Sequence, residues 1–215
     1  MKTAMWLITA KIGVLLCTLT TLISPALSTD FEYDYVTFGS ALKLQNKQYS
    51  VRLHSHEVKY GSGSGQQSVT GQSHTEDANS YWQVRSPTDG HVFRGTPVKC
   101  GQKIRLTHIN TQLNLHSHNF ASPLTDEQEV SCFGEQGEGD HLDNWTVVCS
   151  DEYWERDSYV QLQHDITNQY LAATSQTYGR PISGQREIAA TYSGNRNSCR
   201  WKAMEGVFIK PSEED

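Results

Sequence analysis

The chain has 215 residues, of which 20% are charged, and its formal net charge at pH 7 is −6. This length is enough for one domain or two small ones. The acidic balance argues against nucleic acid as a partner, because nucleic acid is bound through Lys and Arg contacts to phosphate. It argues equally against an anionic membrane surface.

The N-terminal segment has the pattern of a secretory signal peptide. Lys2 and Lys11 supply positive charge, residues 12–23 form an apolar run without an acid, and small residues end the segment at Ser28. A membrane anchor is the alternative, but the run is shorter than the roughly 20 apolar residues that a span needs. The sequence therefore predicts a signal peptide over residues 1–28 and no membrane span. Its removal takes away two lysines and no acid, which leaves a net charge of −8.

Three copies of one pattern follow, and this repeat is the most informative feature of the chain. Its anchors are two leucines and one tryptophan per copy: Leu44, Leu53 and Trp82; Leu106, Leu115 and Trp145; Leu162, Leu171 and Trp201. The anchors of the second copy follow those of the first at almost the same offset, and those of the third copy follow the second at one shorter, constant offset. Chance rarely keeps three anchors at one offset, so the copies should share one fold.

Each copy is predicted to form four short strands. Alternating polar and apolar residues mark the first strand at 41–45, 103–107 and 159–163. A polar turn follows, and the second strand carries the second leucine of the copy. The third strands surround Val69, Val130 and Ile188, and the fourth strands carry the tryptophans. No segment shows helical periodicity over three turns.

Three copies of four strands predict an all-β fold, a β-trefoil. One unit buries too little to stand alone, whereas three can bury their leucines and tryptophans around one pseudo-threefold axis. A propeller, which usually needs at least about four blades, is the structural alternative. The tryptophans are expected in the core, with a ligand-stacking platform as the other interpretation. The predicted segments are a lead-in at 29–37, repeats at 38–93, 94–152 and 153–210, and an acidic tail at 211–215.

Four cysteines follow the signal peptide, and an even number in an oxidising compartment suggests two disulfides with three possible pairings. Cys100 begins the second repeat and Cys149 ends it. Because the first and last strands of a trefoil unit are neighbours, Cys100–Cys149 is the preferred bond, which leaves Cys132–Cys199. A zinc site is the rival interpretation, but the sequence has no C-x-x-C.

Two His-Ser-His triplets are the best chemical signal. His54 and His56 share one face of a strand, as do His116 and His118, because residues i and i+2 point the same way. Two imidazoles can chelate zinc, but the sequence supplies no third ligand, and the third repeat lacks both histidines. No metal is therefore predicted. The histidines are expected to bond the next turn and line a polar surface, or to form a sugar pocket in which Arg52 orients hydroxyl groups.

A glycine-rich segment lies between the second and third strands of the first repeat. Gly61, Gly63, Gly65 and Gln66 belong to it, and it matches neither a dinucleotide-binding motif nor a P-loop. It is expected to be a turn that a ligand or partner backbone can approach closely. The acids of residues 135–140 lack the spacing of an EF-hand, so a solvated loop is favoured over a calcium site.

No catalytic signature is present. The sequence has no G-x-S-x-G motif, and disulfide-bonded cysteines would not be nucleophiles. Asn144 begins an N-glycosylation pattern, but the neighbouring Trp145 is a predicted core anchor, which argues against an attached glycan. The sequence therefore predicts a protein that is not an enzyme and needs no cofactor.

Several segments resemble the MIR-domain family: 51–56, 60–71, 79–82, 94–97, 104–108, 115–118, 201–206 and 210–212. The resemblance covers nearly all of the chain after the signal peptide. It implies a β-trefoil in the lumen of the endoplasmic reticulum that works with a J-domain co-chaperone and BiP. There it would keep misfolded or O-mannosylated clients soluble, as part of quality control and the unfolded protein response.

Two points remain open under this resemblance. Similar proteins often end in an HDEL-like signal, whereas this chain ends in Glu213-Glu214-Asp215, so either partner binding retains it or it is partly secreted. A lectin-like module that binds glycans, or an accessory factor of protein O-mannosylation, is the alternative function. The candidate binding residues are Arg52, His54, His56, Gly61, Gly63, Gly65, Gln66, His116 and His118.

Overall fold

The computed structural model describes residues 34–210. The predicted signal peptide, most of the predicted lead-in and the acidic tail lie outside these residues. The described strands are β1 (Ala41–Asn46), β2 (Arg52–Lys59), β3 (Gln67–Gln72), β4 (Trp82–Arg85), β5 (Lys103–His108), β6 (Asn114–Ala121), β7 (Gln128–Phe133), β8 (Trp145–Val148), β9 (Tyr159–His164), β10 (Tyr170–Thr177), β11 (Arg186–Thr191) and β12 (Trp201–Val207). Short 3-10 turns precede the fourth strands: η1 (Ala78–Ser80), η2 (His141–Asp143) and η3 (Asn197–Cys199). Within residues 34–210, no helix is long and apolar enough to cross a membrane.

Each repeat contributes four strands, as the sequence predicts. In β4 and β8, buried and half-buried residues alternate, which is the period of a strand with one face on the core. Val69, Val130 and Ile188 lie in β3, β7 and β11 without exposed surface. The alternation of polar and apolar residues therefore predicted both the number and the order of the strands.

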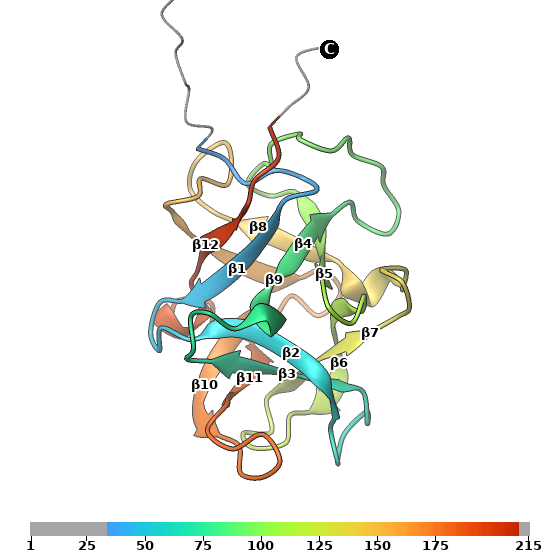
Figure 1. Cartoon of the computed structure of the whole chain (residues 1–215), viewed down its shortest axis with the longest axis vertical. Coiled ribbons are helices and arrows are strands. Elements are labelled where there is room, and N and C mark those ends of the chain that lie inside the picture. Colours follow the sequence, from blue (N-terminus) through green and yellow to red (C-terminus); the bar gives the residue numbers. More distant parts are fainter. Residues whose placement is uncertain (1–33, 211–215) are drawn as a thin grey trace, which may run out of the picture. The chain divides into compact units, whose positions relative to one another are not determined.

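The first and fourth strands of the repeats form a closed ring of six, in the order β1, β4, β5, β8, β9 and β12 (Figure 1). The first strand of the chain pairs with the last, and Asn46 lies opposite Trp201. Closure leaves none of these strands with a free edge that could pair with another molecule.

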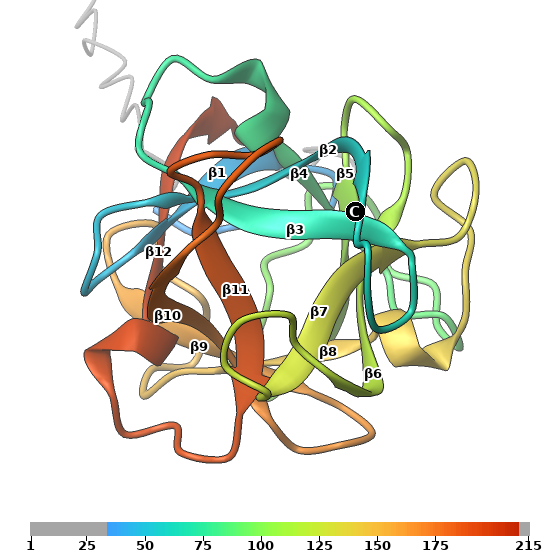
Figure 2. The same ribbon diagram turned by 90° about the horizontal axis from the view of Figure 1, so that it is seen from below.

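The second and third strands form three hairpins that close one end of this ring. The third strands β3, β7 and β11 pair with one another and form a triangle, which Figure 2 shows from below. In this triangle, Gln67 lies opposite Cys132, and Arg186 lies opposite Gly71. Six ring strands closed by three hairpins form a β-trefoil, which confirms the predicted fold and excludes the propeller.

A cycle of backbone hydrogen bonds closes the opposite end. The Val36 amide donates to the Trp154 carbonyl (2.8 Å), Trp154 to Val98 (2.8 Å) and Val98 to Val36 (2.9 Å). All three side chains are fully buried. They are separated by the same two offsets as the repeated leucines. Val36, in the predicted lead-in, thus holds the first-repeat position of a threefold set.

The tryptophans lie in the core, as predicted. Each indole N–H donates a 2.9 Å hydrogen bond to the backbone carbonyl of the repeated leucine: Trp82 to Leu53, Trp145 to Leu115 and Trp201 to Leu171. These six side chains have no exposed surface. A buried indole needs a partner for its N–H, so each leucine supplies both packing surface and an acceptor. The platform interpretation of the three repeated tryptophans is wrong.

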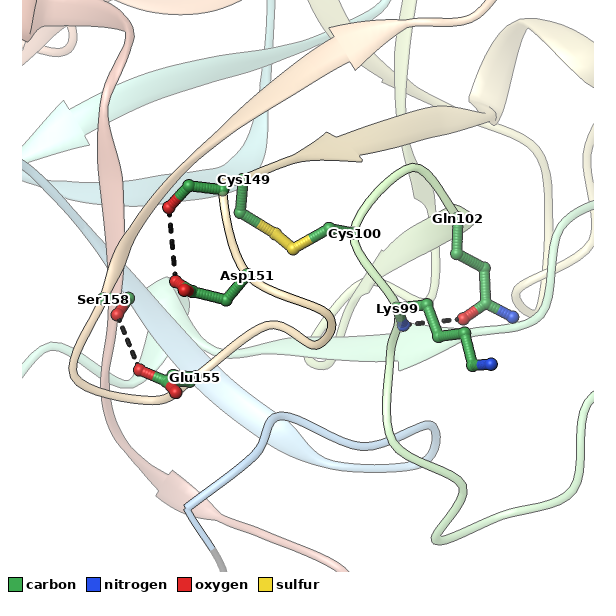
Figure 3. Close-up of a disulfide and its surroundings, with 8 residues drawn as sticks. Lys99, Cys100, Gln102, Cys149, Asp151, Glu155 and Ser158 are labelled. Atoms are coloured by element: carbon green, nitrogen blue, oxygen red, sulfur yellow. Dashed lines mark hydrogen bonds between the residues drawn. A yellow bond between two sulfur atoms is a disulfide. The ribbon is translucent and has the colours of Figure 1, made fainter.

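The predicted disulfide Cys100–Cys149 is present (Figure 3), with its Cα atoms 5.3 Å apart. It joins the segment before β5 to the segment after β8. A turn beside it is held by a 2.9 Å hydrogen bond from the Lys99 amide to the Gln102 side chain. The neighbouring first and last strands of the second repeat therefore bring the two sulfur atoms together, as expected.

The second predicted disulfide, Cys132–Cys199, is wrong. Both thiols are free and buried. Cys132 lies in β7 and its Sγ contacts the Ser55 hydroxyl at 3.3 Å, whereas Cys199 ends η3 and its Sγ contacts the Ser193 carbonyl at 3.3 Å. The pairing rested on the even number of cysteines, but these two belong to different layers of the trefoil.

Candidate functional site

The two His-Ser-His triplets lie in β2 and β6, and each places its histidines on one face. The central hydroxyls point the other way and donate to the paired strand, from Ser55 at 2.8 Å and from Ser117 at 2.7 Å. On the histidine face, the two rings of the first triplet lie 5.2 Å apart and those of the second 5.0 Å apart. The shared face that the spacing predicts is confirmed.

The inner histidine of each triplet is tied to the turn before the fourth strand. His54 Nδ1 lies 2.7 Å from Asp77, and His116 Nδ1 lies 2.8 Å from Asp143. Both histidines are buried, with 3% and 2% exposed. Burial lowers the pKa of His54 in spite of the carboxylate beside it. These bonds to the next turn are the ones that the sequence predicts, and they leave the inner imidazoles little surface for a ligand.

The outer histidines are linked to the hairpin loop of a neighbouring repeat, His56 directly and His118 through Glu129 of its own repeat. His56 Nε2 lies 3.2 Å from Gln185 of the third repeat. His118 Nε2 lies 3.2 Å from Glu129, which is fully buried and also accepts hydrogen bonds from the amide and hydroxyl of Ser64. Burial alone would raise the pKa of Glu129, but hydrogen bonds from His118 and Ser64 outweigh it and lower that pKa. The carboxylate therefore joins the first-repeat loop to the second repeat.

The glycine-rich loop is a turn between β2 and β3, as predicted. Gly63 has a φ of +64°, and a Cβ there would lie 2.0 Å from a Glu129 oxygen, whereas nothing lies within 4 Å of such an atom at Gly61 or Gly65. The Gln66 side chain accepts a 2.6 Å hydrogen bond from Ser131. Among the candidate residues, the structure thus groups this loop with the second triplet and not with the first.

Arg52 is not free to bind a ligand. Its side chain is 6% exposed, and Nη2 forms a 2.7 Å ion pair with Glu205 of β12. Nη1 donates to the Ser50 carbonyl at 3.4 Å. The guanidinium therefore fastens the start of β2 to the closing strand of the ring, beside the first triplet.

Two carboxylates stand near His116, and both cap η2. Asp143 accepts hydrogen bonds from the Asn114 side chain and the Asp140 amide, at 3.1 and 3.0 Å, in addition to facing His116. Asp140 accepts from the Leu142 amide at 2.8 Å. This reciprocal capping box satisfies free amides at the start of the turn and accounts for the position of each carboxylate.

A row of four rings with exposed ends crosses the second repeat. Phe133, His116, His118 and Phe120 follow one another with centroids 4.8, 5.0 and 4.7 Å apart. The two phenylalanines at its ends are 36% and 48% exposed. This row was not predicted from the sequence, although Phe120 continues the i, i+2, i+4 pattern of the triplet on the same face of β6.

A groove of about 960 Å³ adjoins this row. The first repeat contributes the side of Lys59, Gly65 and Gln66, and the second contributes Phe133 and the loop that follows it. Glu135, Glu138 and Asp140 make that loop acidic. The ring row and this acid-lined groove form the second-repeat face, the candidate functional site.

Known proteins share both the sequence and this architecture. The MIR domain family profile matches residues 46–200. Over 178 residues the chain is 59% identical to stromal cell-derived factor 2 of Mus musculus, which covers 83% of this chain and 84% of that protein. The chain belongs to the stromal cell-derived factor 2 family. A relative from Dictyostelium discoideum, a stromal cell-derived factor 2-like protein, is 49% identical over 81% of this chain and 84% of its own.

Solved structures agree with membership of the stromal cell-derived factor 2 family. The crystal structure of the SDF2-like protein from Arabidopsis thaliana has a TM-score of 0.80 and 42% identity, and the match covers 83% of this chain and 99% of that one. The S. cerevisiae protein O-mannosyltransferase Pmt1-Pmt2 complex, bound to the sugar donor, has a TM-score of 0.74 and 26% identity. That match covers 87% of this chain but 28% of the other chain, so the likeness is to one part of a larger protein.

Two further histidines of the chain were not predicted from the sequence to have a role. His108 and His164 end β5 and β9, and each bonds a threonine in its own turn and a backbone carbonyl of the preceding repeat, at 2.8–2.9 Å. Asn46 holds the same position in the first repeat and donates to the Ser198 carbonyl at 2.7 Å. Burial lowers the pKa of His108 to about 4. The repeat offset places these three residues at corresponding positions and would have indicated that they stabilise the fold.

Two groups that could be modified or react, the Cys132 thiol and the Asn144 side chain, are buried. Burial raises the pKa of the Cys132 thiol to about 12, so this sulfur is protonated at neutral pH and is a poor nucleophile. Asn144 is 3% exposed, and its side-chain oxygen accepts a 2.9 Å hydrogen bond from the Thr88 amide. A glycan on Asn144 would have to be attached before folding and would disrupt this contact.

Proposed function

We propose that this chain is a binding protein of the endoplasmic reticulum lumen that acts with a J-domain co-chaperone and BiP on misfolded or O-mannosylated clients, and that it catalyses no reaction. The second-repeat face is the observation that carries the proposal. Its two histidines are held in place by hydrogen bonds to Asp143 and Glu129. Phe120 and Phe133, at the two ends of the row, are exposed at 48% and 36%. Exposed apolar surface next to a groove is typical of a site that binds other molecules.

Several further features support the lumenal setting. A disulfide is expected in an oxidising compartment, and Cys100–Cys149 is one. The relatives named stromal cell-derived factor 2 and the mannosyltransferase complex fit the same location. The acidic groove bears on a different point, the kind of client. Acidic side chains beside exposed rings suit client segments that combine basic and apolar residues.

A second candidate function is glycan binding. The likeness to part of a mannosyltransferase complex bound to its sugar donor favours it. A lectin role would make mannose a competitor of client binding, whereas a chaperone role through the ring row would not. Added mannose therefore separates the two candidates.

The experiment is affinity purification of the chain from a detergent lysate of the secretory pathway, followed by quantification of BiP and J-domain proteins. We expect both to be recovered with wild type, with or without added mannose. Phe120→Ala combined with Phe133→Ala should reduce recovery of denatured client. Phe93→Ala removes a ring that is 71% exposed outside the row and is the matched control. Recovery of neither chaperone, or loss of recovery on adding mannose, would refute the chaperone role.

A further inference from the structure

The third repeat lacks the imidazoles that fill one position in the first two repeats. In the first repeat, His54 and His56 occupy that position, and the second repeat also has two histidines there. In β10 the corresponding residues are Ala172 and Thr174. Two large rings are thus replaced by a methyl group and a small hydroxyl-bearing side chain on the same face of an equivalent strand.

The partner of the missing imidazole has changed as well. Asp77, the partner of His54, precedes η1, and Asp140, which lies 3.8 Å from His116 Nδ1, precedes η2, whereas the corresponding residue before η3 is Arg196. Asp143, the closer partner of His116, ends η2, and the corresponding residue of η3 is Cys199. Arg196 is exposed, and no acid or histidine stands at its side in β10. The third repeat has therefore lost the whole histidine–carboxylate arrangement and has gained a cation at the edge of the position it left.

A pocket of about 240 Å³ occupies the place of the missing rings. Its apolar lining includes Ala172, Ala173 and Ala189, which are 1–4% exposed. Residues with hydroxyl groups also line the pocket, namely Thr125, Thr174, Ser175, Thr191 and Ser198. The Thr125 and Thr174 hydroxyls donate to the buried Glu187 carboxylate at 2.8 and 3.0 Å and keep their oxygen atoms as acceptors. The corresponding positions of the first two repeats hold histidines, so the pocket lies where the threefold symmetry is broken.

All three repeats contribute to the walls. Tyr49 comes from the turn after β1, Glu127 from the hairpin loop of the second repeat, and Arg196 from the turn before β12. The Arg186 guanidinium lies over the Tyr49 ring, 3.9 Å from its centroid. Glu127 and Arg196 have opposite charges, so the residues that line the pocket carry no net charge, which suits a neutral ligand.

We propose that this third-repeat pocket is a carbohydrate subsite that takes one neutral hexose-sized ring. Hydroxyl groups, a carboxylate and a guanidinium together supply the donors and acceptors that several adjacent sugar hydroxyls need, and an aromatic ring with alanine side chains suits the apolar face of a sugar ring. The volume is below the roughly 300–1,000 Å³ of sites for drug-sized ligands, which limits the ligand to one ring. The inference rests on the glycan-bearing clients of the proposed function and names the site that would contact them.

The test is a titration of the full mature chain, labelled with 15N, with methyl α-mannopyranoside, methyl α-glucopyranoside and N-acetylglucosamine. We expect amide shifts in β10, β11 and η3 for at least one sugar, with a dissociation constant in the millimolar range. Ala172→His combined with Arg196→Asp restores the first-repeat pair and fills the pocket, and should weaken binding by about tenfold or more. The milder Glu127→Gln variant keeps the pocket open and should weaken binding several-fold. Glu152→Gln removes an exposed acid that lies outside both this pocket and the second-repeat face, and is the matched control with unchanged affinity.

The outcomes are distinguishable. Equal binding by wild type and the filled variant, shifts confined to the second-repeat groove, or no shifts with all three sugars would overturn the subsite. A filled variant that is folded and loses the sugar but still recovers BiP and the J-domain protein supports the subsite and leaves the chaperone role intact. Sugar binding without recovery of either chaperone by wild type supports the subsite while refuting the proposed chaperone role.

Discussion

Removing the Cys100–Cys149 disulfide should destabilise the fold by about 4 kcal/mol. The bond connects residues 49 positions apart. Cross-linking a loop of that size removes about 14 cal/mol/K of conformational entropy from the unfolded chain, which corresponds to about 4 kcal/mol at 25 °C. This bond is the only disulfide among residues 34–210, so its loss leaves the unfolded state without any cross-link in that part of the chain.

The perturbation is the double variant Cys100→Ala and Cys149→Ala, and the assay is urea unfolding followed by tryptophan fluorescence. We expect the free energy of unfolding to fall by about 2–4 kcal/mol, because measured losses often lie below the entropic value. Reduced wild type should unfold like the double variant. Cys199→Ser introduces the residue of the corresponding first-repeat position, Ser80, and is the control that should stay within about 1 kcal/mol of wild type.

Thiol chemistry gives an independent check on the same reasoning. Cys132 and Cys199 are free and buried, and burial raises the pKa of each thiol. Iodoacetamide should therefore modify them only after unfolding. A loss of stability below about 1 kcal/mol in the double variant, or peptide mapping that finds Cys132 bonded to Cys199, would refute the assigned pairing.

Three further predictions concern the core and the loops. Trp145→Phe should cost about 2–4 kcal/mol in urea unfolding, because the buried Leu115 carbonyl loses its donor and a cavity forms. Burial lowers the pKa of His108 to about 4, whereas the ordinary pKa of histidine is about 6.5. As the pH falls below 6.5, this imidazole therefore binds a proton in the unfolded chain but not in the folded one. Its contribution to the free energy of unfolding is fully present above pH 6.5 and falls by about 3 kcal/mol by pH 4. His108→Asn, which copies the first repeat, should remove that part of the pH dependence of unfolding. Gly63→Ala should lower the free energy of unfolding by at least about 1 kcal/mol more than Gly65→Ala. Both glycines have a positive φ, but only a Cβ at Gly63 would clash with the buried Glu129 carboxylate.

Each of these predictions has a contrary result. Equal unfolding of Trp145→Phe and wild type would mean that the indole hydrogen bond contributes nothing. An unchanged slope of stability against pH in His108→Asn would show that this imidazole is not the neutral, buried group described. Identical losses in the two glycine variants would mean that the loop moves away from the carboxylate without cost.

The fold followed from the sequence because its signals are local or periodic. The two repeat offsets aligned Trp82, Trp145 and Trp201, and alternation located the strands around them. The bond of His54 to the next turn also follows from proximity along the chain within one repeat. These contacts join residues of the same unit, so the sequence of that unit is enough to predict them.

The contacts between repeats could not be predicted from the sequence. Glu129 joins Ser64 to His118 because β3 pairs with β7, and no local pattern states which hairpins meet. The Cys132–Cys199 pairing failed for the same reason. The absence of histidines in the third repeat was visible, but the pocket it opens depends on Tyr49, which belongs to another repeat.

A reconstituted aggregation assay tests the central claim most directly. A denatured glycoprotein client is diluted into buffer with BiP, ATP, a J-domain protein and the purified mature chain, and light scattering is followed. We predict that the chain delays aggregation in the presence of the J-domain protein, that Phe120→Ala with Phe133→Ala removes the delay, and that Phe93→Ala retains it. Aggregation that proceeds at the same rate with and without the chain would contradict the account.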